Sequence, residues 1–295
     1  MAPRRLDHID RYEIVRKLGE GGMGNVYLCF DPDLRRHVAI KVIKDALLET
    51  SSSSPDNKQE YISRFVREAL TTSQLQHPQI PPVYEVKQHI SGQVYYVMKA
   101  VEGVSLRDIL DGLREGDARI VEKYDLFRLI FILQSVCQAI MYAHSHGFIH
   151  RDLKPSNIFV GDYGEVYVMD WGLTKALKMQ YAAASQQRET GKEAEQPDEE
   201  PTQIDEGAKG TQGFDADTSP ATGDTLTLPG RIMGTLVYMP PEQALGSVEK
   251  LGVGADIYAL GAMLYEMLTL NPPAEGHTNR EMLDKKLEGE ITPCE

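Results

Sequence analysis

The sequence has few of the features that mark secreted, membrane-spanning or metal-stapled proteins. Its three cysteines, Cys29, Cys137 and Cys294, are far apart and form no C-x-x-C pair. They predict neither a disulfide framework nor a zinc site, and they suit a reducing compartment. The charged N-terminus, Met1 to Arg11, has no apolar stretch of the kind that a signal peptide needs. The most apolar region, Leu126 to Met141, is interrupted by polar residues, so we expect a buried amphipathic helix, too short and too polar to span a bilayer.

The chain also lacks the basic footprint of a nucleic-acid-binding protein. Its net charge is -13, which argues against a polyanionic partner. The acidity is concentrated in residues 181–230, which carry 11 acidic and three basic side chains. Residues 178–229 are poor in large apolar side chains, so they cannot bury enough surface to offset the entropy of ordering, and we expect them to be disordered.

The remaining sequence predicts strands first and helices later. The first hundred residues suggest one helix at 60–76 and strands at 12–18, 24–30, 37–43, 83–86 and 94–101. After Gly103 the pattern predicts helices at 105–113, 124–146 and 256–270, with short strands at 158–160 and 166–169. This order favours an α+β protein.

A glycine-rich motif lies between the first two expected strands. Gly19-Glu20-Gly21-Gly22-Met23-Gly24 fits G-x-G-x-x-G, in which glycines let the backbone approach phosphates closely. A dinucleotide-binding site with the same motif would open a helix. Here the glycines run into Asn25 to Leu28, which is typical of a strand. The motif therefore predicts a hairpin flap over phosphates.

Lys41 ends the next apolar strand, Val38-Ala39-Ile40-Lys41, and is well placed to neutralise phosphate oxygens. A lysine in that position needs an anionic partner to hold it. Glu68 is the best-placed carboxylate on the helix expected at 60–76, and Glu60 is the alternative.

The strongest chemical signal is the run His150-Arg151-Asp152-Leu153-Lys154-Pro155-Ser156-Asn157, followed by Asp170-Trp171-Gly172. One carboxylate can accept the proton of a substrate hydroxyl, while a second carboxylate and an amide hold Mg²⁺ on phosphates. A lysine can offset the charge on the transferred group. The residue types and their spacing thus predict phosphoryl transfer.

In this order, the motifs resemble those of the Hanks-type (eukaryotic-like) protein kinase catalytic domain, close to its bacterial serine/threonine branch. The resemblance implies a two-lobed α+β fold. Residues 1–102 would form a small antiparallel β lobe with one helix, and residues 103–295 a larger, mainly helical lobe. The acidic stretch at 178–229 would be an insertion in the activation segment. Kinase domains of this type continue for several helices after the one that contains Asp256, so we expect the domain to be truncated at its C-terminus.

The resemblance also implies ATP and Mg²⁺ as cofactors, and it assigns roles to single residues. Asp152 would be the catalytic base, and Lys154 would contact the γ-phosphate. Lys41 would contact the α- and β-phosphates, with Glu68 as its carboxylate partner. The Mg²⁺ ligands are Asn157 and Asp170. The ATP contacts, including a gatekeeper at 98 and a hinge at 99–101, are Gly19, Gly21, Gly22, Gly24, Val26, Ala39, Lys41, Met98, Lys99, Val101 and Phe159.

The implied function is transfer of the ATP γ-phosphate to Ser/Thr hydroxyls of proteins, including autophosphorylation by self-association, as in a non-specific serine/threonine protein kinase. The alternative is an inactive kinase-fold scaffold that binds nucleotide. We expect a cytoplasmic domain without nucleic-acid or membrane contacts, although relatives in the family often carry a membrane anchor beyond the kinase.

Two positions modify this expectation. Trp171 stands where the family usually has phenylalanine, and we expect it to be tolerated as another large aromatic plug. Arg151 before Asp152 suggests an activation segment that is ordered by a phosphate paired with the arginine. Thr225 and Thr227 are the hypothetical autophosphorylation sites.

Overall fold

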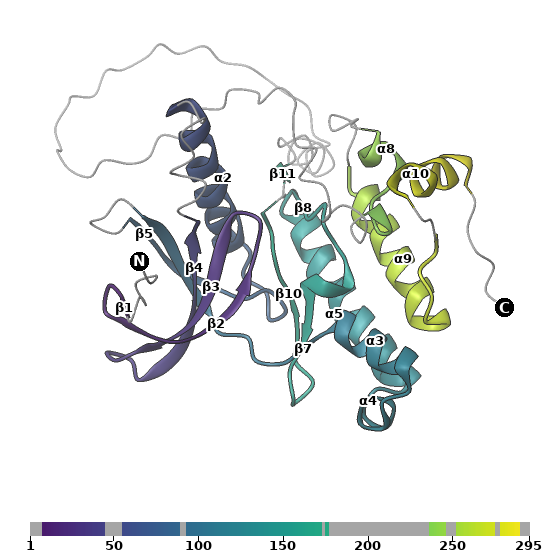
Figure 1. Cartoon of the computed structure of the whole chain (residues 1–295), viewed down its shortest axis with the longest axis horizontal. Coiled ribbons are helices and arrows are strands. Elements are labelled where there is room, and N and C mark those ends of the chain that lie inside the picture. Colours follow the sequence, from purple (N-terminus) through teal and green to yellow (C-terminus); the bar gives the residue numbers. More distant parts are fainter. Residues whose placement is uncertain are drawn as a thin grey trace, which may run out of the picture.

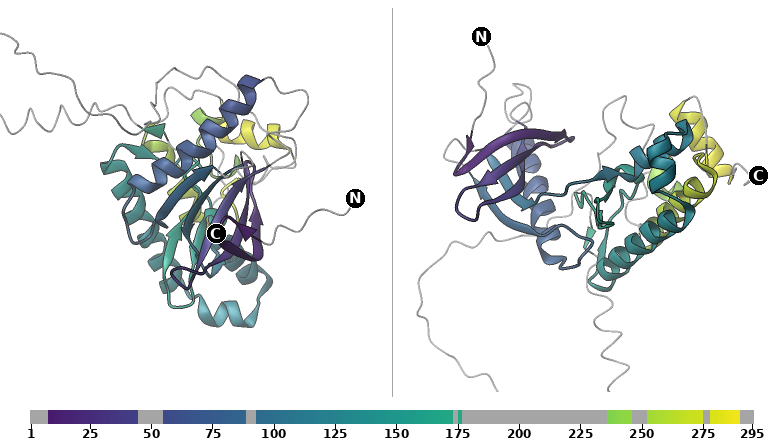
Figure 2. Two further views of the ribbon diagram at one scale, coloured as in Figure 1. Left: turned by 90° about the vertical axis from the view of Figure 1, so that its left-hand side faces the viewer. Right: turned by 90° about the horizontal axis from the view of Figure 1, so that it is seen from below.

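The computed structural model describes residues 8–44, 55–88, 93–172, 175–176, 236–245, 252–274 and 278–289. Figure 1 shows the strands of the first hundred residues gathered on one side with helix α2, and the later helices gathered on the other. The right-hand view of Figure 2 shows the same separation from below. The expected two-lobed α+β fold is confirmed.

The small lobe is built on one antiparallel sheet in the order β1-β2-β3-β4-β6-β5. In that order the strands span His8–Ile9, Tyr12–Glu20, Gly24–Asp31, Arg36–Ile43, Val94–Lys99 and Val83–Gln88. The sequence predicted all of them except β1, whose two residues are too few to show a period. Strand β4 lies near the centre of the sheet, between β3 and β6. It pairs with both neighbours without a register shift.

The two faces of β4 serve different cores, because side chains alternate along a strand. Val38, Ile40 and Val42 point into one buried cluster, and Ala39 and Ile43 point into the other. Helix α2 (Pro55–Gln74) covers the second face.

Helix α2 places its apolar stripe on the sheet through Phe65 and Ala69, which are fully buried. It begins five residues before the predicted start. Glu68 lies on the same buried stripe, so a charged side chain is carried into the core between helix and sheet.

The large lobe contains helices joined by short strands. Its helices are α3 (Leu106–Glu115), α4 (Ala118–Lys123), α5 (Leu126–Ser145), η1 (Pro155–Asn157), α8 (Pro241–Ala244), α9 (Gly254–Thr269) and α10 (Asn279–Glu288). Its strands are β7 (Val104–Ser105), β8 (Phe148–Ile149), β9 (Ile158–Val160), β10 (Val166–Val168) and β11 (Lys175–Ala176). The expectations did not include α4, α8, α10 or the two-residue strands.

Ser105 caps α3, as its sequence predicted. Its side chain accepts a hydrogen bond from the backbone of Asp108, whose side chain bonds back to the cap in a capping box. Gly116 ends the helix with a φ of 72°, a left-handed conformation that glycine adopts without strain. Asp117 then caps α4, so the chain turns twice before α5 begins.

Helix α5 corrects the expectation that this region is too short and too polar to span a bilayer. Its 20 residues are long and apolar enough to cross a membrane by composition alone, and it is the one described helix that is. This observation is weak evidence for a span, because core helices of soluble proteins pass the same test. One face of α5, represented by Ile132, Val136 and Ala139, is buried in the core of the large lobe. That packing accounts for the apolar side chains on this face, whereas Phe127, Phe131 and Met141 are exposed.

The acidic stretch at 178–229, with Thr225 and Thr227, lies outside the described residues. The chain is described again from Leu236, in a turn that leads into α8.

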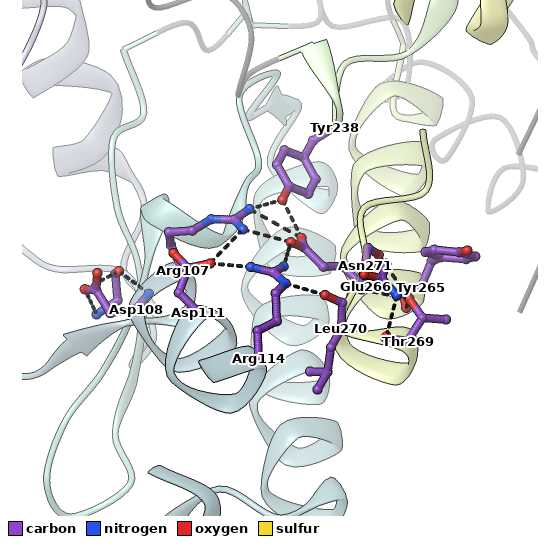
Figure 3. Close-up of polar contacts among 11 residues, drawn as sticks. Arg107, Asp108, Asp111, Arg114, Tyr238, Tyr265, Glu266, Thr269, Leu270 and Asn271 are labelled. Carbon is purple, nitrogen blue, oxygen red and sulfur yellow. Dashed lines mark hydrogen bonds and ion pairs between the residues drawn. The ribbon is translucent and has the colours of Figure 1, made fainter. Parts of the chain in front are cut away.

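A buried carboxylate connects this turn to α3 and α9. Glu266 of α9 is 1% exposed and accepts hydrogen bonds from Arg107, Arg114 and Tyr238, with Arg107 Nη1 at 2.8 Å (Figure 3). Arg114 also donates to the carbonyl of Leu270, which closes the C-terminal end of α9. Three segments far apart in the sequence therefore depend on one charge.

We expect Glu266→Gln to lower the free energy of unfolding by about 2 kcal/mol, because the amide keeps the shape but removes the buried charge that Arg107 and Arg114 share. The half-exposed Asp111 is then their remaining counter-charge. Urea denaturation followed by circular dichroism measures the change. Glu288→Gln on the exposed part of α10 is the matched control and should change stability by less than about 0.5 kcal/mol. Equal stability of the two variants would contradict the assignment.

Candidate active site

Lys41 lies on the central strand and points toward α2. It pairs with Tyr96 of β6 and with Val26 of β3. Its Nζ is 2.5 Å from Glu68 Oε1, and both residues are buried. The alternative partner was wrong, since Glu60 forms an ion pair with Arg64 on the outer surface of α2.

The ion pair extends to Asp170 of the Asp-Trp-Gly triplet, whose Oδ1 is 3.5 Å from Lys41 Nζ. Burial alone would lower the pKa of Lys41, but the negative charges around it, including Glu68 and Asp170, raise it well above its ordinary value. Burial raises the pKa of Glu68, and the Lys41 ammonium opposes that rise. The Lys41 ammonium lowers the pKa of Asp170. Lys41 therefore favours the ionised form of both carboxylates.

The glycine-rich hairpin between β2 and β3 is shaped by two different requirements. A Cβ on Gly24 would lie 2.6 Å from the carbonyl oxygen of Val42, so packing within the protein requires glycine there. A Cβ on Gly19 or Gly22 would meet nothing within 4 Å. The turn is closed by a hydrogen bond from the Gly21 N–H to the Gly24 carbonyl, at 2.8 Å. Because no neighbouring atom requires glycine at 19 and 22, a bound phosphate is a physical reason for it.

The loop after β8 holds the second group of expected residues. Lys154 Nζ donates to Asp152 Oδ2 at 2.7 Å, and Asn157 Nδ2 donates to the Asp152 carbonyl at 2.8 Å. The same amide nitrogen lies 3.4 Å from Asp152 Oδ2. The structure therefore brings the three side chains together around one carboxylate.

Asp256 of α9 holds this loop by its backbone. Its two carboxylate oxygens accept the N–H groups of His150 at 2.9 Å and Arg151 at 2.8 Å. His144 of α5 adds a third contact at 2.7 Å. Burial alone would raise the pKa of Asp256, but the hydrogen bond from His144 and those from the backbone lower it overall. Arg151 has a φ of 68°, a strained conformation that these bonds maintain.

A short hairpin brings Asn157 close to Asp170. Strands β9 and β10 pair so that Ile158 lies opposite Val168, and the Met169 N–H donates to the Asn157 carbonyl at 2.8 Å. Asp170 then turns out of the strand with a φ of 64°. The side chain of Asp170 is 52% exposed.

The donor atoms of Asn157 and Asp170 suit a hard divalent cation. The Asn157 amide nitrogen is used as a donor to the loop, so its oxygen is the atom available to a cation. A carboxylate and an amide oxygen are ligands that Mg²⁺ prefers. The residues therefore fit the implied metal.

Three of the residues expected around adenine, Val26, Ala39 and Met98, share one region of the sheet. Ala39 and Met98 are directly opposite each other on β4 and β6, and both are buried. Val26, on the same face, packs against their cluster. Phe159 lies on β9 of the large lobe, and Val101 follows the end of β6.

Lys99 ends β6 and connects the two lobes. Its N–H donates to the Pro82 carbonyl at 3.0 Å. Its Nζ lies 2.5 Å from the Tyr167 hydroxyl and 4.6 Å from the centre of that ring. The sequence offered no signal for this contact, because the two residues are 68 positions apart.

Trp171, in place of the usual phenylalanine, packs against the loop at residues 150–157 through His150 and is 1% exposed. Its ring meets the His150 ring at 4.6 Å, and its Nε1 donates to the Val168 carbonyl at 3.1 Å. A phenylalanine cannot make that hydrogen bond.

Comparison with known proteins agrees with this geometry. The family model described as "Protein kinase domain" matches residues 12–191. The chain belongs to the protein kinase domain family. Its kinase relatives include proteins named "Serine/threonine-protein kinase PknD" from Protochlamydia amoebophila, Chlamydia pneumoniae and Chlamydia muridarum.

The similarity to these kinases extends over most of the chain. The identity is 37% over 90% of this chain for the Protochlamydia protein. It is 34% over 97% for the C. pneumoniae protein and 36% over 93% for the C. muridarum protein. The aligned regions are 23%, 26% and 26% of the relatives' own lengths, so the chain spans about a quarter of the curated relatives that it matches.

The sequence analysis missed the residues that hold other site residues in place by hydrogen bonds. The Tyr96 hydroxyl donates a hydrogen bond to the buried carboxylate of Glu68. His144 shares a hydrogen bond with the buried carboxylate of Asp256. Gln243 of α8 donates to the Arg151 carbonyl at 3.0 Å. None has a motif of its own, since each is recognisable only by what lies opposite it in the fold.

Trp171 is the single tryptophan of the chain, so its fluorescence reports on this site alone. We expect iodide to quench the native emission far less than that of free tryptophan, because the ring is buried. Emission should move to longer wavelength, and quenching should rise, when the chain is unfolded in urea. Native quenching as strong as that of the unfolded chain would contradict the burial of this residue.

Proposed function

We propose that this chain is the catalytic domain of a serine/threonine protein kinase, which transfers the γ-phosphate of ATP to protein hydroxyls. The observation that carries the proposal is a contact between charged side chains of the two lobes. The Lys41–Glu68 pair of the small lobe reaches Asp170 of the large lobe, and Asp170 lies at the end of the hairpin that begins at Asn157. The names of the relatives support the serine/threonine class.

In the proposed reaction, Asp152 accepts the proton of the attacking hydroxyl. The hydroxyl oxygen forms a bond to the γ-phosphorus while the bond between that phosphorus and the β–γ bridging oxygen breaks, leaving ADP. Lys154, which already contacts Asp152 at 2.7 Å, offsets negative charge on the transferred group. Lys154 two residues after the base is the form of the loop seen in serine/threonine kinases.

Binding of ATP is assigned to the small lobe and to the hinge. Lys41 contacts the α- and β-phosphates beneath the glycine flap, while Met98, Lys99 and Val101 line the adenine side. Asn157 and Asp170 would hold Mg²⁺, which supplies positive charge to the phosphates when bound.

We further infer that residues 1–102 and 103–295 are the two lobes, that the partners are proteins with Ser/Thr acceptors, and that the domain functions in the cytoplasm. Self-association would allow autophosphorylation. The second candidate is an inactive scaffold that only binds nucleotide. A measurement of phosphoryl transfer distinguishes the two candidates.

The decisive measurement is transfer of labelled γ-phosphate from ATP with Mg²⁺, to the chain itself and to a generic basic protein. We expect transfer, and we expect Asp152→Asn to reduce it by roughly a hundredfold or more, because the variant lacks the base. Removal of Mg²⁺ with a chelator should also abolish it.

The matched control is Asp162→Asn. Asp162 is a highly exposed carboxylate in the β9–β10 turn, and it pairs with Lys123. This variant should retain the rate of the unaltered chain. Mg²⁺-dependent ATP binding without transfer would overturn the kinase assignment and favour the scaffold.

Arg151 supports a regulatory part of the proposal. Its Nε and one of its terminal nitrogens are buried and have no hydrogen-bond partner among the described residues. Burial lowers the pKa of the Arg151 guanidinium. An anion brought next to it would satisfy these donors, and a phosphate on Thr225 or Thr227 has the required charge and oxygens.

We expect phosphopeptide mapping after incubation with ATP and Mg²⁺ to find phosphate on Thr225 or Thr227. Replacing both with alanine should lower the activity several-fold, whereas Thr218→Ala in the same stretch should not. A stretch that carries no phosphate in active protein would refute this part of the proposal.

A further inference from the structure

The carboxylate of Glu68 is held by donors on one of its two oxygens. Glu68 Oε1 accepts from Lys41 Nζ at 2.5 Å and from the Tyr96 hydroxyl at 2.7 Å. Glu68 Oε2 is buried and has no hydrogen-bond partner among the described residues. It faces Gly172, where an added Cβ would lie 3.0 Å away. The orientation of the carboxylate therefore depends on Lys41 and Tyr96.

The two donors differ in what else they must do. Lys41 lies 3.5 Å from Asp170 and, in the proposed function, also contacts phosphates. Its three N–H groups are shared among several anions. The Tyr96 hydroxyl has a single hydrogen to donate, and it points to Glu68. Tyr96 is thus the donor that ligand binding does not draw away.

The surroundings of Tyr96 keep its hydroxyl in place. The residue is 4% exposed and lies directly opposite Lys41 on the neighbouring strand. Its ring packs against Phe65 of α2 with ring centres 5.2 Å apart, and Phe65 is one helical turn before Glu68. Burial and the neighbouring Glu68 raise the pKa of Tyr96 well above its ordinary value, so the phenol remains a donor.

We propose that Tyr96 is a positioning residue: its hydroxyl fixes the Glu68 carboxylate, and with it helix α2, so that Lys41 is presented to the phosphates of ATP. This inference rests on the proposed function. The sheet supplies the rigid frame, since Tyr96 is in the strand between β4 and β5. Helix α2 is held in place because two of its residues contact Tyr96: Glu68 through a hydrogen bond and Phe65 through its ring.

Tyr96→Phe tests the inference, since it keeps the ring and removes only the hydroxyl. We expect the KM for ATP to rise roughly tenfold, with the KM for the protein substrate within about twofold of the unaltered chain. A tyrosine that matters only for folding would not affect one substrate selectively.

Tyr95→Phe is the matched control. Tyr95 is the preceding residue of the same strand and points to the other face, where its hydroxyl donates to Asp10. This variant also loses a hydrogen bond from tyrosine to a carboxylate, but at a site remote from Lys41. We expect both kinetic constants to change by less than about twofold.

A double-mutant cycle identifies Glu68 as the group through which Tyr96 acts. In a Glu68→Ala background, Tyr96→Phe should cause no further rise in the KM for ATP, because the acceptor is already absent. An unchanged KM in the single variant, or additive effects in the double variant, would overturn the inference.

Amide hydrogen exchange makes the test independent of catalysis. Tyr96→Phe should increase exchange in residues 61–72 of α2, and Tyr95→Phe should not. If the unaltered chain transfers no phosphate, the proposed function fails, and this exchange experiment still decides the role of Tyr96. Equal exchange in the two variants would overturn it.

Discussion

The buried ion pair between Lys41 and Glu68 is the interaction on which the rest of the site depends. Removing two charges from water is unfavourable unless each finds close partners. The protein supplies two further partners, because Tyr96 of β6 also donates to Glu68 and Asp170 lies near Lys41. The pair therefore sets the distance between α2 and the sheet, and it connects the small lobe to the Asp-Trp-Gly turn of the large lobe.

A second buried carboxylate plays the same part in the large lobe. Asp256 accepts two backbone N–H groups of the catalytic loop and a hydrogen bond with His144. Glu266, three turns along α9, gathers Arg107, Arg114 and Tyr238. One helix thus fixes both the loop that carries Asp152 and the turn that leads into α8. Gln243 of α8 returns to the loop at the Arg151 carbonyl, so the two anchors are connected.

Several positions that matter for the site were readable before the fold was known. Lys41, Asp152, Asn157 and Asp170 lie in motifs whose chemistry explains each residue type. The structure places Lys41 near Asp170 and Asn157 next to Asp152. The strands and the long helices were also predictable, because their apolar periods and caps are local. Short elements such as α4 and β7 were not, since two to six residues carry too little pattern.

Other features depend on partners that are remote in the sequence. In the sequence, Tyr96 resembles any other apolar strand residue, and only the fold shows that its hydroxyl meets Glu68. His144 is likewise an ordinary residue near a helix end, and only the fold brings Asp256 to it. The choice between Glu60 and Glu68 was left open for the same reason, as both lie on one helix and only packing decides which faces β4. The sequence by itself determined the chemical groups and the family, because motifs record residue types at fixed spacing. The tertiary structure alone decided which buried charges meet and which donors satisfy them, because a hydrogen bond depends on distance in space.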